Sequence, residues 1–146
     1  MTRRTPVATI LSVLATAAAI FLAAPLRADD GHSPKVCSNA SLKGSYGFYR
    51  TGTNAHGPLA AVGLITFDGK GNSTATQSIS RNGDIEFDVT FPGTYVIGAD
   101  CTGKGFTPDG DEFVRLVVME AGKSLLMFSE APGNAVYGVG TRTREE

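Results

Sequence analysis

The side chains that could do chemistry in this sequence are few, and they form no known catalytic pattern. A Ser-His-Asp triad needs a histidine inside the fold, and the one candidate is His56, which falls in a predicted loop. The Gly-x-Ser-x-Gly elbow, phosphate-binding loops and dinucleotide fingerprints are absent. The chain has only two cysteines and two histidines, and no Cys-x-x-Cys spacing. We therefore expect no catalytic residue, no metal and no cofactor, and the sequence favours a protein that is not an enzyme.

Three residues are candidates for contact with a ligand: Arg115, Tyr95 and Phe113. Arg115 is the only charge in the run from Phe113 to Met119, and strand alternation places it on the same face as Phe113. If that face is the interior, Arg115 is an anion anchor. An outward Arg115 is the preferred alternative, because strands near their ends often mix faces. Tyr95 is a further polar group that could face an apolar pocket.

The N-terminus has the pattern of an export signal. Arg3 and Arg4 precede an apolar run from Val7 to Pro25, and the small residue Ala28 follows. A basic start, an apolar middle and a small exit residue are typical of a secretory signal peptide. A retained anchor is the alternative, because a spanning helix needs ~20 apolar residues. We expect cleavage after Ala28, no membrane span afterwards, and a periplasmic or extracellular protein.

Cys37 and Cys101 are the only cysteines in the chain. In an oxidising compartment a disulfide between them is the expected state. The bridge closes a loop of roughly 65 residues, which stabilises a fold by about 4 kcal/mol in the chain-entropy model. A redox pair or a metal thiolate site is the alternative, and the absence of a Cys-x-x-Cys motif disfavours it.

The stretch from Leu59 to Gly103 reads as several antiparallel strands separated by turns. Asn82-Gly83 predicts a type I′ hairpin turn, which needs a positive φ at both central residues. Strict alternation after this turn predicts a half-buried strand. Its apolar face is Ile85, Phe87, Val89 and Phe91. Because proline cannot donate to a ladder, we expect a bulge or sharp bend at Pro92-Gly93.

Turn signals divide the rest of the chain into about eight short strands, with 18 glycines and no helical periodicity after residue 28. Consecutive strands with short connections usually pair as neighbours. We therefore predict an all-β fold, an antiparallel up-and-down barrel of about eight strands, with a β-sandwich as the alternative. In the barrel, the first strand (residues 46–51) pairs with the last (residues 137–142).

Length and charge give the domain organisation and exclude one class of partner. A chain of 146 residues fits one domain. We assign residues 1–28 to the signal, 29–42 to a mobile leader, 43–142 to the barrel and 143–146 to a polar tail. Cleavage removes three arginines and no acidic residue, so the remaining domain is more acidic than the formal charge of −1 of the whole chain. Such a domain, without a basic stripe, is not expected to bind nucleic acid.

The segments FDGKGN and GTYVIGADCTG resemble a set of uncharacterised exported bacterial proteins. The resemblance runs from about Cys37 to Arg142. It implies a calycin-like small barrel, the shape class of lipocalins and allene oxide cyclase. The chain has no tryptophan and so lacks the lipocalin Gly-x-Trp signature. The shared motifs are turn glycines and strand aromatics, so no functional residue is carried over.

The sequence supports three functions. The preferred one is a noncatalytic exported barrel that binds a small apolar or amphipathic ligand, an expectation that rests on analogy of fold. The second is a structural or interaction module of the cell envelope, which a contiguous exposed apolar patch would favour. The third is a cyclase or isomerase acting at the barrel mouth, which needs Arg115, Glu86 or Tyr95 aimed into an apolar pocket. The sequence predicts no oligomeric state.

Overall fold

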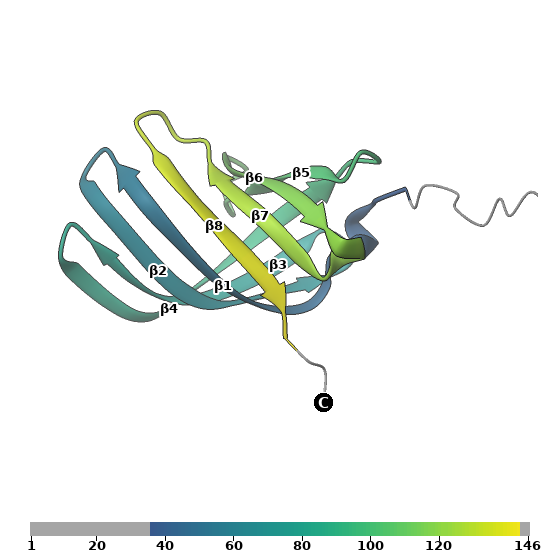
Figure 1. Ribbon diagram of the computed structural model, residues 1–146, viewed down its shortest axis with the longest axis horizontal. Helices are drawn as coiled ribbons and strands as arrows, with labels where there is room; N and C mark the ends of the chain where they lie inside the picture. Colours follow the sequence, from purple (N-terminus) through teal and green to yellow (C-terminus); the bar gives the residue numbers. More distant parts are fainter. Residues whose placement is uncertain (1–35, 144–146) are drawn as a thin grey trace, which may run out of the picture. The chain divides into compact units, whose positions relative to one another are not determined.

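The computed structural model shows an all-β fold, a closed up-and-down barrel of eight antiparallel strands within the described residues 36–143 (Figure 1). The strands are β1 (Lys43–Asn54), β2 (Gly57–Asp68), β3 (Asn72–Arg81), β4 (Asp84–Ile97), β5 (Thr102–Phe106), β6 (Glu112–Met119), β7 (Ser124–Ser129) and β8 (Ala135–Arg142). Two short 3₁₀ helices are η1 (Asn39–Ser41) and η2 (Glu120–Gly122). Each strand pairs with its neighbour in sequence. The predicted barrel is confirmed, and the sandwich alternative is excluded.

The predicted signal peptide (residues 1–28) lies outside the described residues, as do residues 29–35 of the predicted leader and residues 144–146 of the predicted tail. In the described part of the chain, no helix has both the length and the apolar character needed to span a membrane. The barrel strands begin at Lys43 and end at Arg142.

The barrel closes through the first and last strands, and the predicted pairing of these two strands is confirmed. Tyr46 of β1 lies opposite Arg142 of β8, and Thr51 lies opposite Tyr137. This pairing leaves neither terminal strand with a free edge along its paired length. The hairpin between β3 and β4 is confirmed by a φ of 51° at Asn82 and 97° at Gly83, the two positive values that a type I′ turn requires.

Strand β4 differs from its prediction. The pairing with β3 shifts register between Gln77 and Ile79, so that Phe87 and Asp88 together face Ser78. Asp88 has a φ of 53°, as a bulge allows. Because the extra residue reverses the alternation, the predicted four-residue apolar face is wrong: Val89 and Phe91 are half-buried inside the barrel, whereas Ile85 and Phe87 are exposed, Phe87 by 75%.

The bulge that was expected at Pro92 lies instead at Phe87–Asp88, and Pro92 stays in register with β3. Strand β5 pairs with β4 only from Thr94 to Ile97, so residues 84–93 pair on one side alone (Figure 1). The Tyr95 amide donates to Gly71 O at 2.8 Å on the β3 side. Amides alternate along a strand, so the Pro92 nitrogen faces the unpaired edge, where proline removes no ladder hydrogen bond.

The turn between β2 and β3 is organised by the Asp68 carboxylate. Its Oδ1 accepts from the backbone amides of Lys70, Gly71 and Asn72 at 2.7–3.0 Å. Its Oδ2 accepts from the Asn72 side-chain amide at 2.6 Å. These hydrogen bonds, first the one from the Asn72 side chain, hold the pKa of Asp68 well below its usual range.

One end of the barrel, here called the base, is filled by a cluster of buried apolar side chains. Its members are Leu42, Tyr46, Phe67, Tyr95, Ile97, Leu116, Val118 and Leu125. The Phe67 ring meets the Tyr46 and Tyr95 rings edge to face, with centroids 5.5 Å and 4.9 Å away. This is a favourable arrangement for aromatic quadrupoles. The base therefore closes the interior from one end.

The hydroxyl of Tyr46 joins three elements at the base. It donates to the carbonyl of Gly122 in η2 at 2.6 Å and accepts from Arg142 Nη2 of β8 at 2.8 Å. The Arg142 guanidinium also lies 5.3 Å from the centre of the Tyr46 ring, a cation–π contact. Tyr46 itself is fully buried. The Tyr46 hydroxyl therefore links the paired strands β1 and β8 to the segment between β6 and β7.

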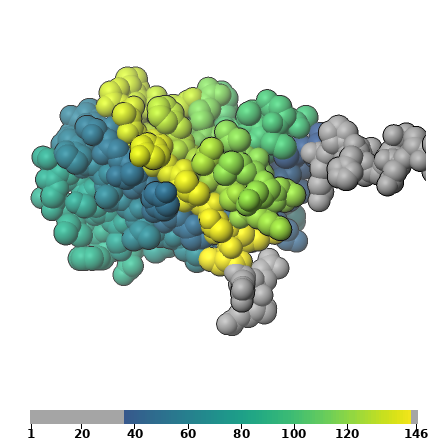
Figure 2. All heavy atoms as spheres, viewed as in Figure 1, coloured from purple at the N-terminus to yellow at the C-terminus, as the bar shows by residue number. Residues whose placement is uncertain are grey.

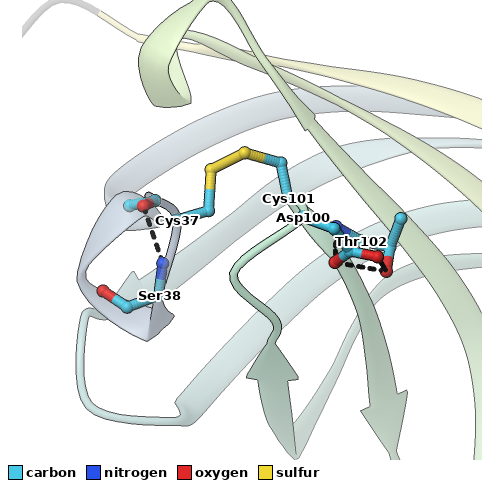
Figure 3. The surroundings of a disulfide bond; sticks show 6 residues. Cys37, Ser38, Asp100, Cys101 and Thr102 are labelled. Carbon is cyan, nitrogen blue, oxygen red and sulfur yellow. Dashed lines mark hydrogen bonds between the residues drawn. A yellow bond between two sulfur atoms is a disulfide. The ribbon is translucent and has the colours of Figure 1, made fainter. Parts of the chain in front are cut away.

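The Cys37–Cys101 disulfide is present, with a Cα–Cα distance of 5.0 Å that is ordinary for such a bridge. Figure 3 shows it joining the segment before η1 to the turn between β4 and β5. The Cys37 amide also donates to Ala99 O at 3.3 Å. Residues 37–42, assigned to the leader from the sequence, are thus attached to the base, where Leu42 is fully buried.

Candidate ligand-binding cavity

A cavity of about 60 Å³ lies inside the barrel and is lined by all eight strands. The base forms its floor through Phe67, Tyr95 and Leu116. Its walls are mostly apolar and include Phe48, Ile65, Phe91 and Met127. A water-sized group needs roughly 10–15 Å³ of such space, so the cavity holds about five of them. This is below the roughly 300–1,000 Å³ of sites that enclose a whole drug-sized ligand.

Two polar side chains interrupt this apolar lining. Gln77 of β3 is 3% exposed, and its Oε1 has no hydrogen-bond partner among residues 36–143. Arg50 of β1 buries its Nε, which likewise has no partner within the described chain. Removal from water lowers the pKa of Arg50, and the nearby charge of Arg81 adds to the effect. The guanidinium still stays protonated, because arginine is not deprotonated in proteins.

The strands beside Arg50 and Gln77 carry glycine where a side chain would collide. Gly138 of β8 is paired with Arg50 of β1. A Cβ on Gly138 would lie 2.8 Å from the Arg50 Cβ and 2.3 Å from Tyr49 O. Gly63 of β2 is likewise paired with Gln77 of β3, and a Cβ on Gly63 would lie 2.9 Å from the Gln77 Cβ. Both polar side chains therefore extend over bare backbone.

At the end opposite the base, here called the mouth, a second arginine is already paired. Arg81 is hydrogen-bonded to Glu86 in an ion pair. Glu86 lies opposite the buried Ile79, so the β4 bulge turns Glu86 to the inner side of the sheet. The Glu86 carboxylate offsets the Arg81 charge, and no carboxylate within residues 36–143 forms an ion pair with Arg50.

The structure places two of the three predicted ligand contacts at the cavity. Tyr95 and Phe113 line it, while Arg115 lies on the outer surface with its side chain 49% exposed. Arg115 pairs there with Glu112, at 3.0 Å from Nε to Oε1, and with Glu130.

The parity argument for Arg115 fails because of an irregularity. The β5–β6 register shifts between Gly105 and Phe106, so Phe113 has no direct partner and the alternation restarts at Val114. Phe113 can therefore reach the cavity while Arg115 points outward.

Tyr95 has its polar end engaged at the base. The hydroxyl lies 2.9 Å from Leu42 O and 3.0 Å from Asn39 O, and it has one hydrogen to share between these carbonyls. Burial raises the pKa of Tyr95. The hydroxyl therefore serves the packing of the N-terminal segment, and the ring alone faces the cavity.

Sequence reasoning missed Arg50 and Gln77, although a signal for both exists. Arg50 follows Tyr46 and Phe48 at intervals of two, and Gln77 stands between Ala75 and Ile79 at the same interval. Residues that alternate with buried apolar ones share their face. Alternation alone would have placed both polar side chains in the interior.

The outer surface of β6, β7, β8, β1 and β2 carries a row of directly paired apolar residues. In order around the barrel they are Val117, Leu126, Val139, Tyr49 and Val62. Phe128 and Tyr137 form a second pair beside this row. All except Val139 are exposed, and the part on β6–β8 is hollowed into a groove of about 310 Å³. We call this set the outer apolar face; Figure 2 shows the side of the molecule where β8 crosses between β1 and β7.

Comparisons with known proteins add little to this geometry. No protein-family model and no curated protein matches the chain. A solved structure that it resembles is a designed protein from the de novo design of a fluorescence-activating β-barrel, at 13% identity and a TM-score of 0.43. The match covers 70% of this chain and 94% of the designed one. The barrel assignment rests on the strand pairing described above.

Proposed function

We propose that this protein is a noncatalytic, exported β-barrel that binds a small apolar or amphipathic ligand in its interior. The observation that carries the proposal is the cavity, because a barrel with a filled interior would have nowhere to hold a ligand. The base and the disulfide close one end, so a ligand would enter at the mouth. The small volume means that only a compact part of the ligand fits inside.

Export is part of the proposal and is supported by two features. The N-terminal pattern of Arg3, Arg4 and the apolar run ending at Pro25 is typical of a signal peptide. The disulfide is of the kind that persists in oxidising compartments such as the periplasm or the extracellular space. The proposed kinship to calycin-like exported barrels rests on the turn and strand motifs of the sequence.

Native mass spectrometry of the oxidised protein, purified from its own host, tests the proposal. Cleavage after Ala28 gives a defined mass for the mature chain, and the disulfide lowers this mass by two hydrogen atoms. An additional mass that is lost on denaturation is the expected result for a carried ligand. A protein that carries no additional mass and takes up no amphiphile offered to it would contradict ligand binding.

The outer apolar face supports a second candidate, an interaction module of the cell envelope. Contiguous exposed apolar surface of this kind is uncommon on proteins without a partner. Leu126→Asp places a charge in the middle of the face, and Val96→Asp makes the same kind of change at an exposed position on β4. If the face binds a partner or a second copy, only the first variant reduces complex formation in cross-linking of intact cells. Equal cross-linking of both variants would contradict this candidate.

A further inference from the structure

Among residues 36–143, the barrel interior holds an arginine whose buried Nε has no partner. Arg81 forms an ion pair with Glu86, and Arg142 donates a hydrogen bond to the Tyr46 hydroxyl. The buried Nε of Arg50, in contrast, has no partner among residues 36–143. Taking a charged group out of water without a compensating partner is strongly unfavourable. The buried Nε therefore points to a binding partner outside residues 36–143.

Gln77 gives a second, independent indication at the same place. Its side chain is more deeply buried than that of Arg50, and its Oε1 also has no hydrogen-bond partner within the described chain. Buried polar atoms nearly always find a hydrogen-bond partner. A carboxamide can present its oxygen or, after rotation by 180°, its NH₂ group to a bound molecule. The two orphaned groups thus offer one charged donor and one adaptable amide.

The strand between them leaves the space open. Arg50 lies opposite Ala61 of β2, and Gln77 lies opposite Gly63 of the same strand. These two small residues are the inward positions of β2 at this level, so no large side chain from β2 fills the gap between β1 and β3. Both polar side chains line the cavity, with Ile65 and Phe67 further toward the base.

We propose that Arg50 and Gln77 form an anion subsite, and that the ligand is a small amphiphile with a single carboxylate head and a compact apolar tail. The inference rests on the proposed function and specifies its ligand class. The guanidinium binds the carboxylate through charge-assisted hydrogen bonds, and the Gln77 amide contacts the same head. The tail lies toward the aromatic floor. One guanidinium matches one negative charge, which favours a carboxylate over a dianionic phosphate.

Isothermal titration calorimetry with butanoate and 1-butanol tests the subsite, because these probes are short enough for the cavity. The two probes share one chain length and differ in the head group. The wild-type protein is expected to bind butanoate on the order of tenfold to a hundredfold more tightly than butanol, the range for a charged hydrogen bond. Arg50→Met is expected to abolish this preference, because it lowers the affinity for butanoate far more than the affinity for butanol. Gln77→Leu is expected to reduce this preference by a smaller factor.

Arg115→Met is the matched control, because it removes the same charge from the outer surface and is expected to leave both affinities unchanged. A merely structural role for Arg50 would lower the affinity for both probes together, and that result would overturn the inference. Equal binding of butanoate and butanol to the wild-type protein would also overturn it, while ligand binding itself would stand. If neither probe binds, both the subsite and the proposed function fail. The wild-type comparison needs no variant, so it stands even if Arg50→Met does not fold.

Discussion

Replacing Tyr46 by phenylalanine removes one hydroxyl from the base of the barrel, and we expect the free energy of unfolding to fall by about 2.5–4 kcal/mol. The hydroxyl donates to Gly122 O at 2.6 Å and accepts from the Arg142 guanidinium at 2.8 Å. A neutral hydrogen bond contributes about 1 kcal/mol and one to a charged group about 1.5–3 kcal/mol. The ring and its cation–π contact stay, so the loss reports the hydroxyl alone. Urea unfolding followed by far-ultraviolet circular dichroism measures it, since the chain has no tryptophan.

Tyr49→Phe is the control, because it makes the same chemical change three residues along the same strand, on a side chain that is 53% exposed. It is expected to change stability by less than about 0.5 kcal/mol. A double-mutant cycle with Arg142→Met should give a coupling free energy of about 0.5–3 kcal/mol, because the two side chains are in contact. Equal decreases in the free energy of unfolding for Tyr46→Phe and Tyr49→Phe would refute the conclusion that the Tyr46 hydroxyl stabilises the pairing of β1 with β8.

Three other perturbations have definite expectations. Replacing Cys37 and Cys101 together by serine should lower the free energy of unfolding by up to about 4 kcal/mol, and reduction of the wild-type protein should match it in urea titration. Asp68→Ala should destabilise more at pH 6 than at pH 2. The folded pKa of Asp68 lies below its unfolded value, so its contribution is complete above about pH 4 and declines as the pH falls toward the folded pKa. Gly83→Ala should lower the free energy of unfolding by about 1–2 kcal/mol, because alanine is strained at the positive φ of this position. Gly122→Ala should lower it by more in the same assay, because the new Cβ would lie 2.1 Å from Ser41 O.

The parts of the fold that sequence reasoning predicted depend on local chemistry or on simple topology. Asn82-Gly83 determines its own turn because few other residues adopt two successive positive φ values. The Cys37–Cys101 bridge follows from having two cysteines and an export pattern. The β1–β8 closure follows from short connections, because a next-neighbour sheet of this size removes its edges by closing. Each of these predictions needed no knowledge of how distant side chains pack.

The parts that were missed depend on single-residue irregularities. The bulge at Asp88 and the register shift beside Phe113 each reverse which side chains face inward. One extra residue in a strand is enough, because the side-chain period is two. Asp88 has no glycine or proline beside it that would signal the bulge, and Gly105 at the second shift lies on β5, not on the strand that carries the extra residue Phe113. The curvature of the closed barrel is a property of all its strands. The alternation rule therefore holds at Arg50, where β1 is regular, although it was not applied there, and it does not hold between Phe113 and Arg115.

The closure of the barrel also has a consequence for the way the chain reaches its native state. The β1–β8 ladder joins residues at opposite ends of the domain, such as Tyr46 and Arg142. Folding rates fall as contacting residues become more distant in sequence, because the entropy of the intervening loop must be lost first. The hairpins can form early and locally, but this last ladder needs the whole domain. A nascent chain that ends before β8 would therefore expose β1 as an unpaired edge, and β1 is the strand that carries both Tyr46 and Arg50.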